Sequence, residues 1–155
     1  WRRNGQYARG LVADLSPASW TAQPVADVRI NHPAWILCDL NVYAPICSAM
    51  LRDEPFADPI EHRFGQRSEV SENPEEYPPG ATVLREFEAL HADAEHALSG
   101  ASPEVFGASN PLDRWRGVNP TIGDMLVTLM VKHESGHLGQ LSAWRRAMGM
   151  ARVPM

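Results

Sequence analysis

The 155-residue chain has little cysteine, no long apolar run and no excess of positive charge. Its two cysteines, Cys38 and Cys47, lie nine positions apart in one expected helix, where a separation of about 13 Å excludes a disulfide between them. No run of about 18 apolar residues occurs, so we expect no transmembrane helix. The 14 Lys and Arg are outnumbered by 19 Asp and Glu, which argues against binding to nucleic acid or an anionic membrane. We therefore expect a reduced, cytoplasmic protein.

Strand-like patterns are also missing, because the chain has no alternating apolar and polar runs rich in Val, Ile and Thr. Apolar residues instead recur every three or four positions, which is typical of helices that bury one face. Prolines and glycines divide the chain into four such segments. The expected helices cover residues 3–15, 31–52, 81–98 and 119–149. The sequence thus predicts an all-α fold.

The connection between the second and third expected helices determines the expected topology. Residues 53–80 contain five prolines and are too many for a tight turn between antiparallel helices. A segment of this length can cross the bundle and let the two helices run parallel. We predict a four-helix bundle of the up-down-down-up type, formed by a single domain over residues 1–155. In the connection 100–118, we expect Trp115 to cap the bundle.

The strongest sign of chemistry is a pair of histidines, His133 and His137, in the last expected helix. Residues four positions apart share a helix face, so the two imidazoles can bind one divalent ion. They share an apolar stripe with Leu126, Met130 and Leu141, which predicts that both rings face the core. A buried imidazole without a partner costs about 1–3 kcal/mol. A metal-binding pair and a hydrogen-bonded core pair are both compatible with this pattern.

Residues 133–137 also match the zinc-protease pattern H-E-x-x-H, in which the glutamate is the general base. Such sites need a third protein ligand, which usually follows the pair in the chain. Residues 138–155 contain no His, Asp, Glu or Cys. We therefore expect no protease activity, no catalytic role for Glu134, and a third ligand from an earlier helix.

Two residues of earlier helices are candidates for that third ligand. Asp39 lies one turn from both Trp35 and Tyr43, so its carboxylate is expected to face the core. A buried carboxylate is costly unless it binds a metal or is paired in a salt bridge or hydrogen bond. His91 lies on the inner face of the third expected helix, where it is either a ligand or a hydrogen-bonded core residue.

The other histidines have no expected role in chemistry. His32 is expected to help the turn at a helix start, His62 lies in the proline-rich connection, and His96 is off the apolar stripe of its helix. Cys38, next to Asp39, is expected to be a small buried thiol.

Two glycines in the last expected helix, Gly136 and Gly139, each cost about 1 kcal/mol relative to alanine. Either they leave open space beside His137, or they permit close packing of a neighbouring helix.

Two blocks of the sequence resemble the DinB-like family of metal-binding four-helix bundles. They are residues 31–40, NHPAWILCDL, and residues 133–146, HESGHLGQLSAWRR. The second block combines the histidine pair with the Gly-Gln that often follows it in this family. The resemblance covers essentially the whole chain and implies an up-down-down-up bundle, usually a homodimer, that holds one divalent metal ion on three histidines.

For the metal site, the resemblance implies that His133 and His137 are ligands, and it aligns Asp39 with the third histidine of the family. The implied ion is nickel or zinc, with iron or manganese as alternatives. If Asp39 is only an outer hydrogen-bond partner of the rings, His91 is the expected replacement ligand.

Family members with known activity are metal-dependent transferases and isomerases that use mycothiol, bacillithiol or glutathione. The leading hypothesis is therefore a metal-dependent thiol S-transferase or isomerase, whose partners are a small-molecule thiol and an electrophilic substrate. Two further hypotheses follow from Asp39. Two histidines and one carboxylate form the ligand set of non-haem iron oxygenases, and a missing third histidine is also expected of a nonenzymatic bundle that binds a metal or small ligand at a degenerate site.

Overall fold

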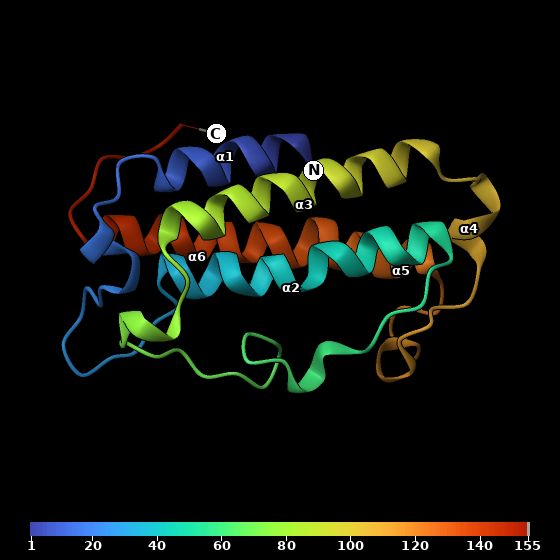
Figure 1. Ribbon diagram of the computed structural model, residues 1–155, viewed down its shortest axis with the longest axis horizontal. Coiled ribbons are helices and arrows are strands. Elements are labelled where there is room, and N and C mark those ends of the chain that lie inside the picture. The colour runs from blue at the N-terminus through green and yellow to red at the C-terminus, as the bar shows by residue number, and fades with distance from the viewer. Residues whose placement is uncertain (155) are drawn as a thin grey trace.

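Four long helices form the body of the protein in a computed structural model that describes residues 1–154 (Figure 1). They are α1 (Arg2–Val12), α2 (Pro33–Arg52), α3 (Gly80–Gly100) and a fourth helix built from α5 (Ile122–Leu126), a π-helical segment (Val127–His133) and α6 (Glu134–Ala147). The connections contain α4 (Pro103–Gly107) and four 3₁₀ turns (Pro17–Thr21, Pro59–Glu61, Pro74–Glu76 and Asp113–Trp115). Within residues 1–154 no strand occurs, so the predicted all-α fold is confirmed.

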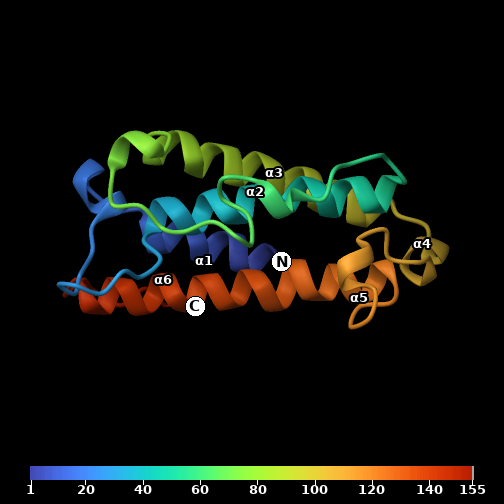
Figure 2. The same ribbon diagram turned by 90° about the horizontal axis from the view of Figure 1, so that it is seen from below.

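The long connection 53–79 allows α2 and α3 to run in the same direction. In Figure 1, α2 and α3 run from left to right, whereas α1 and the fourth helix run from right to left. Figure 2 shows, from below, how the connection returns along the bundle from the end of α2 to the start of α3. A loop that is distant from the fourth helix in sequence is thereby brought close to it.

The start of α2 is determined by its local sequence. Pro33 occupies the first turn, where a missing backbone N–H has no cost. The Trp35 backbone N–H donates a hydrogen bond of 3.2 Å to Nδ1 of His32, which is the N-cap residue. His32 therefore has the turn-forming role expected of it, and the helix begins two residues after the predicted boundary at 31.

α2 is also the central helix, because 17 of its 20 residues are buried. Among residues 1–154 it is the one helix whose length and hydropathy would suit a membrane span, but 89% of that apolar window is buried inside the protein. One core cluster packs around Ile36, Phe87 and Trp144, and a second packs around Met50, Met125 and Leu129. The apolar character of α2 is thus explained by protein on nearly all of its sides.

The fourth helix begins at Ile122 and ends at Ala147, within the predicted range 119–149. It starts later than predicted because Thr121 and Asp124 satisfy each other's backbone N–H groups in a capping box. Its middle was not predicted. In a π-helical segment the backbone bonds span five residues instead of four, so the following turns rotate relative to α5.

This rotation changes which residues of α6 face the core. Glu134 and Arg145 are only 2% and 3% exposed, and they are buried together with Leu138 and Leu141. Arg145 donates to the Leu11 carbonyl and to the Asp14 carboxylate, and so fastens α6 to the end of α1. A uniform α-helical period does not predict the burial of either charged residue.

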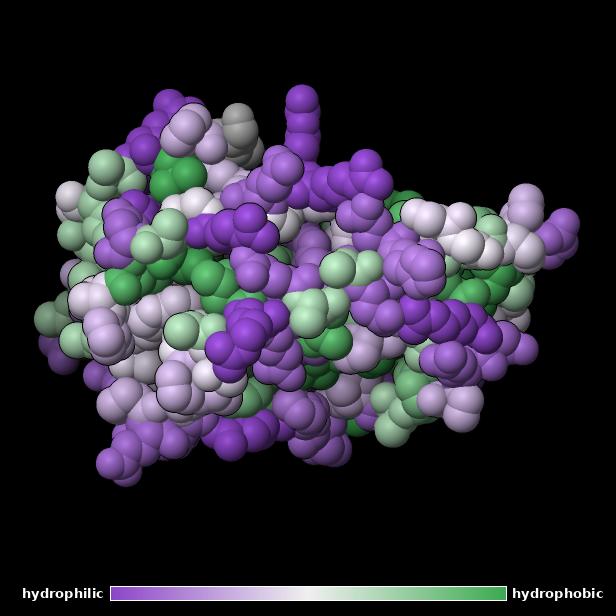
Figure 3. Space-filling view, turned by 45° about the horizontal axis from the view of Figure 1, so that its top comes forward, coloured by the Kyte–Doolittle hydropathy of each residue, from purple (hydrophilic) through white to green (hydrophobic). Residues whose placement is uncertain are grey.

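The face that carries α1 and α3 is mixed in polarity. Figure 3 shows hydrophilic residues across the middle of this face and hydrophobic residues in small separate groups. Arg2 pairs with Glu95, and Arg9 pairs with Glu88 at 2.6 Å, so exposed ion pairs connect the two helices. Exposed pairs of this kind typically add little stability, and the buried contacts hold α1 in place.

Candidate metal centre

Asp39, His133 and His137 come together between α2 and the fourth helix. Oδ2 of Asp39 lies 3.0 Å from Nε2 of His133 and 3.1 Å from Nε2 of His137, and the two Nε2 atoms are 3.0 Å apart. Atoms that bind one ion at about 2.1 Å must lie within roughly 4.2 Å of one another, and these three do. Within residues 1–154, this is the one group of three His, Cys, Asp or Glu side chains with such convergence.

The Asp39 carboxylate is buried and lacks a well-directed partner. Its side chain is 3% exposed, and within the described residues Oδ2 has no hydrogen bond of acceptable direction despite the short distances. Burial raises the pKa of Asp39, but His133 and His137, which can donate to the carboxylate and carry positive charge when protonated, outweigh burial and bring the pKa below its ordinary value. An ionised oxygen with an unused lone pair therefore faces the two rings, and a cation at this point would neutralise it.

The orientation of His137 is fixed by Gln140 on the same helix. Oε1 of Gln140 lies 3.1 Å from Nδ1 of His137 and also accepts a hydrogen bond of 3.0 Å from Asn31. Because an amide oxygen can only accept, Nδ1 of His137 carries the proton and Nε2 presents its lone pair. Metal-binding histidines usually have an outer partner of this kind.

Aromatic side chains from α2 hold both imidazole rings. Trp35 packs against His137 with the ring centres 5.7 Å apart, and Tyr43 meets His133 edge-on at 5.0 Å. Burial and then the Asp39 carboxylate raise the pKa of Tyr43, so its hydroxyl remains protonated at neutral pH. Trp35 and Tyr43 lie one helical turn before and after Asp39, so each aromatic ring contacts one of the two histidines.

The three residues line a cavity of about 310 Å³, which we call the inner cavity. Its remaining wall is mostly aromatic and apolar, formed by Trp35, Tyr43, Gln66, Trp115, Met125, Thr128 and Leu129. Gln66 comes from the connection between α2 and α3, and Trp115 comes from the connection before the fourth helix. Trp115 was expected to cap the bundle, and it forms part of the cavity wall.

These side chains fit a divalent metal ion. Two imidazole nitrogens and a carboxylate oxygen are established ligands of zinc and of non-haem iron. Their convergence and the unpartnered Oδ2 are both explained by a shared cation. The same ligand types suit nickel as well, so the donor set does not select one metal.

His91 lies outside this group. Its Nε2 is 2.7 Å from Oε2 of Glu134, and its ring stacks on Trp1 with the centres 3.7 Å apart. Neither His91 nor Glu134 lines the inner cavity. Of the two roles expected for His91, the structure gives it that of a hydrogen-bonded core residue, and it is not in position to replace Asp39.

The remaining predictions for single residues have mixed outcomes. His62 and His96 are exposed and lie apart from the cavity. Burial raises the pKa of Cys38 to about 12, so it is a buried, unreactive thiol as predicted. Close helix packing does not explain Gly136 and Gly139, because an added Cβ would meet nothing within 4 Å at either position.

A model of the DinB superfamily matches residues 1–141, from α1 into α6. The chain belongs to the DinB superfamily. The matched range includes the three donor residues of this DinB protein and the helices that position them. No curated protein and no solved structure matches the chain. The family assignment therefore supports the fold and a possible metal site, and leaves the reaction to be inferred from the residues.

Sequence reasoning assigned no role in the site to Gln140 or Gln66. Gln140 lies three positions after His137, and its place on the same helix face was a usable signal. Gln66 lies 67 positions before His133 in a proline-rich loop, and no local pattern connects the two. Its position depends on the path of the whole connection over the bundle.

Proposed function

We propose that this DinB protein binds one divalent metal ion through Asp39, His133 and His137, and acts as a thiol S-transferase or isomerase. The supporting observation is the convergence of three donor atoms in one cavity, with Oδ2 of Asp39 lacking another partner among residues 1–154. A bound divalent ion would lower the pKa of a thiol and so supply a thiolate nucleophile at neutral pH.

The other residues of the inner cavity have separable roles in this proposal. Gln140 holds His137 in the tautomer that presents Nε2. Trp35, Met125 and Leu129 exclude water and favour an apolar electrophile. The Tyr43 hydroxyl is available to donate a hydrogen bond to a bound substrate, because its pKa is raised.

Metal content provides the first test. We expect close to one nickel or zinc ion per chain in protein purified without an affinity tag, and none in the His133→Ala/His137→Ala double variant. The matched control is His62→Ala/His96→Ala, which removes two exposed histidines and should keep the metal. Full metal retention in the first double variant would show that the ion binds elsewhere.

Thiol consumption provides the second test. The metal-loaded protein is screened with small thiols and a panel of electrophiles, and the metal-free protein is the control. We expect metal-dependent loss of thiol that disappears in the His133→Ala/His137→Ala variant. Stoichiometric metal binding without thiol consumption would favour the alternative of a nonenzymatic metal-binding bundle.

A second candidate function follows from the ligand types themselves. Two histidines and one carboxylate are the ligand set of non-haem iron oxygenases. In that case anaerobic protein loaded with ferrous iron should develop colour with nitric oxide, and the Asp39→Ala variant should not. A zinc-only protein with no ferrous binding would exclude this candidate.

A further inference from the structure

A second cavity shares two lining residues with the inner cavity. It measures about 390 Å³ and is lined by Ile60, Gln66, Arg67, Arg114 and Trp115; we call it the outer cavity. Gln66 and Trp115 line both cavities. The two cavities are therefore neighbours, and a ligand that extends from the metal site past these two side chains would reach a space bordered by two arginines.

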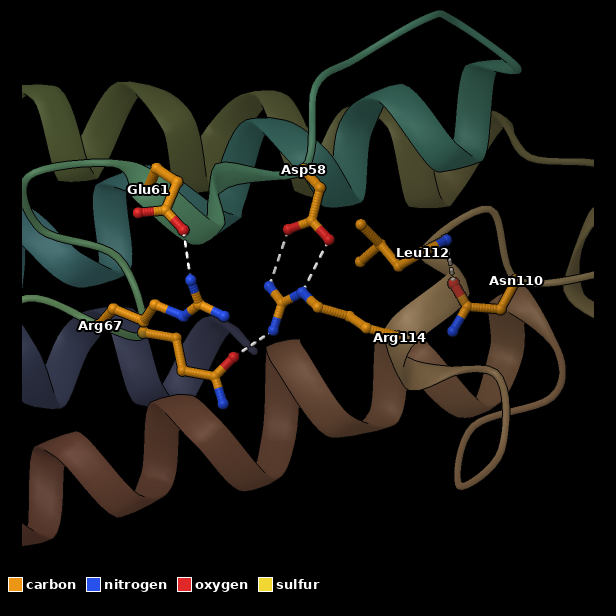
Figure 4. Close-up of polar contacts among 7 residues, drawn as sticks. Asp58, Glu61, Arg67, Asn110, Leu112 and Arg114 are labelled. Carbon is orange, nitrogen blue, oxygen red and sulfur yellow. Dashed lines mark hydrogen bonds and ion pairs between the residues drawn. The ribbon is translucent and has the colours of Figure 1, made fainter.

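Arg114 is held rigidly across the two long connections. Figure 4 shows two nitrogens of its guanidinium directed at the two oxygens of Asp58. Nε and Nη2 donate to the two Asp58 oxygens at 2.7 and 2.8 Å, and Nη1 donates to Oε1 of Gln66. A guanidinium has five N–H donors, and these partners use three of them. The Tyr43 hydroxyl is a further hydrogen-bond partner of Arg114, so one N–H group is left for a ligand.

Arg67 is held in the same manner but more loosely. Its Nη1 donates to Glu61 at 2.5 Å (Figure 4), and its side chain is 66% exposed. Asp58 and Glu61 do not line the outer cavity. The two carboxylates thus orient the guanidiniums from outside, while the residues that line the cavity contribute donor groups and no carboxylate.

Gln66 adds to this donor surface. Its oxygen accepts one hydrogen bond from Arg114, and its amide nitrogen offers two N–H donors. Planar guanidinium and amide donors together match the geometry of a carboxylate. The apolar wall of the inner cavity and the donor wall of the outer cavity therefore favour a ligand with one apolar end and one anionic end.

We propose that the outer cavity binds a carboxylate of a small organic ligand through Arg114, Arg67 and Gln66, while the other end of the ligand occupies the inner cavity. This proposal rests on the proposed function for one point, that the end of the ligand in the inner cavity carries a thiol that approaches the metal. Because each arginine already has a carboxylate partner, the expected preference is moderate, about tenfold in affinity from charge-assisted hydrogen bonds.

The experiment compares matched probes on the zinc-loaded full chain by calorimetry. The probes are ω-mercaptocarboxylates and ω-mercaptoalcohols with alkyl chains of two to six carbons. We expect the carboxylate to bind about tenfold more tightly than the alcohol at the chain length that spans both cavities. This ratio should fall toward one in Arg114→Gln and decrease in Arg67→Gln.

Two further variants separate a binding role from a structural one. Arg116→Gln is the matched control, because Arg116 pairs with Asp113 on the same loop and does not line the outer cavity. It should keep the tenfold ratio. Loss of the Arg114 contacts also loosens the loops, so Arg67→Gln, which removes an exposed residue with one ion pair, provides independent evidence.

A second probe series, alkanoates against alkanols of equal length, separates this inference from the proposed function. A carboxylate preference in this series that depends on the two arginines would support the outer cavity. If the thiol probes of the first series then bind no more tightly than the matching probes without a thiol, thiol binding at the metal is contradicted. No carboxylate preference in either series, or a preference that persists in both arginine variants, would overturn the outer-cavity proposal.

Discussion

Nε2 of His91 lies 2.7 Å from Oε2 of Glu134, and this buried contact joins α3 to α6. Glu134 directly follows His133, yet its carboxylate is directed toward α3 and away from the inner cavity. The second residue of the H-E-x-x-H pattern is therefore part of the packing between helices. This arrangement agrees with the expectation from sequence that Glu134 is not a general base.

Replacement of Glu134 should affect stability more than metal binding. Glu134→Ala leaves His91 buried without an acceptor, so we expect the free energy of unfolding to fall by about 1–3 kcal/mol. Glu134→Gln retains an acceptor oxygen and should lose less. Urea unfolding measures both variants, and zinc titration should give nearly wild-type affinity in each. A folded Glu134→Gln protein that no longer binds zinc would contradict this assignment.

The burial of Glu134 also shows where sequence periodicity stopped being informative. The repeat of apolar residues correctly predicted a long fourth helix and an inward position for His137. It assumed one uniform turn throughout, whereas the π-helical segment rotates α6 relative to α5. Glu134 and Arg145 consequently face the core, where His91 and the Leu11 carbonyl are their hydrogen-bond partners. These partners lie on other helices, so the periodicity of α6 alone could not predict them.

The metal-binding residues could be predicted from the sequence, whereas the loop residues around the cavities could not. Asp39, His133 and His137 were identifiable because each lies at helical spacing from apolar neighbours. Gln66 and Arg114 lie in irregular connections, where no period relates a residue to its surroundings. Their contact depends on the folded path of two loops, so it required the three-dimensional structure.

Alanine at the two glycines of α6 should stabilise the protein. An added Cβ at Gly136 or Gly139 meets nothing within 4 Å, and each glycine costs up to about 1 kcal/mol in a helix interior. We expect Gly136→Ala and Gly139→Ala to raise the free energy of unfolding by up to that amount in urea denaturation. Gly80→Ala is the control with the opposite expected result, destabilisation, because its Cβ would overlap the Trp20 ring. Destabilisation by both α6 variants would reveal a packing role.

The pairing of Asp93 with Arg52 should make stability depend on pH in acid. Two hydrogen bonds from Arg52, at 2.6 and 3.1 Å, and a smaller contribution from Ser48 lower the pKa of Asp93 from 3.8 to about 2. A lowered folded-state pKa means that the stabilisation is present above the unfolded value and is lost as the pH falls through the folded value. Between pH 4 and about 2, unfolding free energy should therefore decline more steeply in the wild type than in Asp93→Asn. If the unfolding free energies of the two proteins fall in parallel with pH, the Asp93–Arg52 pair does not contribute to the pH dependence of stability.

Charge at Asp39 should control how strongly the site binds a metal and how it acts on a further ligand. With two neutral imidazoles and one carboxylate, a divalent ion and its protein ligands carry a net charge of about +1, whereas a third imidazole would leave about +2. We therefore expect Asp39→His to lower the pKa of a thiol bound to zinc and to raise any thiol-transfer activity. Asp39→Asn keeps the shape of the side chain and removes its charge, so zinc binding should weaken by at least roughly tenfold, the lower end of the losses seen even for outer partners of metal ligands.

Zinc titration of the metal-free wild type, Asp39→Asn and Asp39→His measures these differences, and urea unfolding without metal is the control for folding. Oδ2 of Asp39 lies about equally far from both Nε2 atoms, at 3.0 and 3.1 Å. If Asp39 binds the metal, Asp39→Asn should lose zinc affinity while remaining folded. If all three proteins bind zinc equally, Asp39 only supports the two rings, and the ion is held by His133 and His137 with other partners. Because His91 is committed to Glu134, those partners would have to come from solvent or substrate.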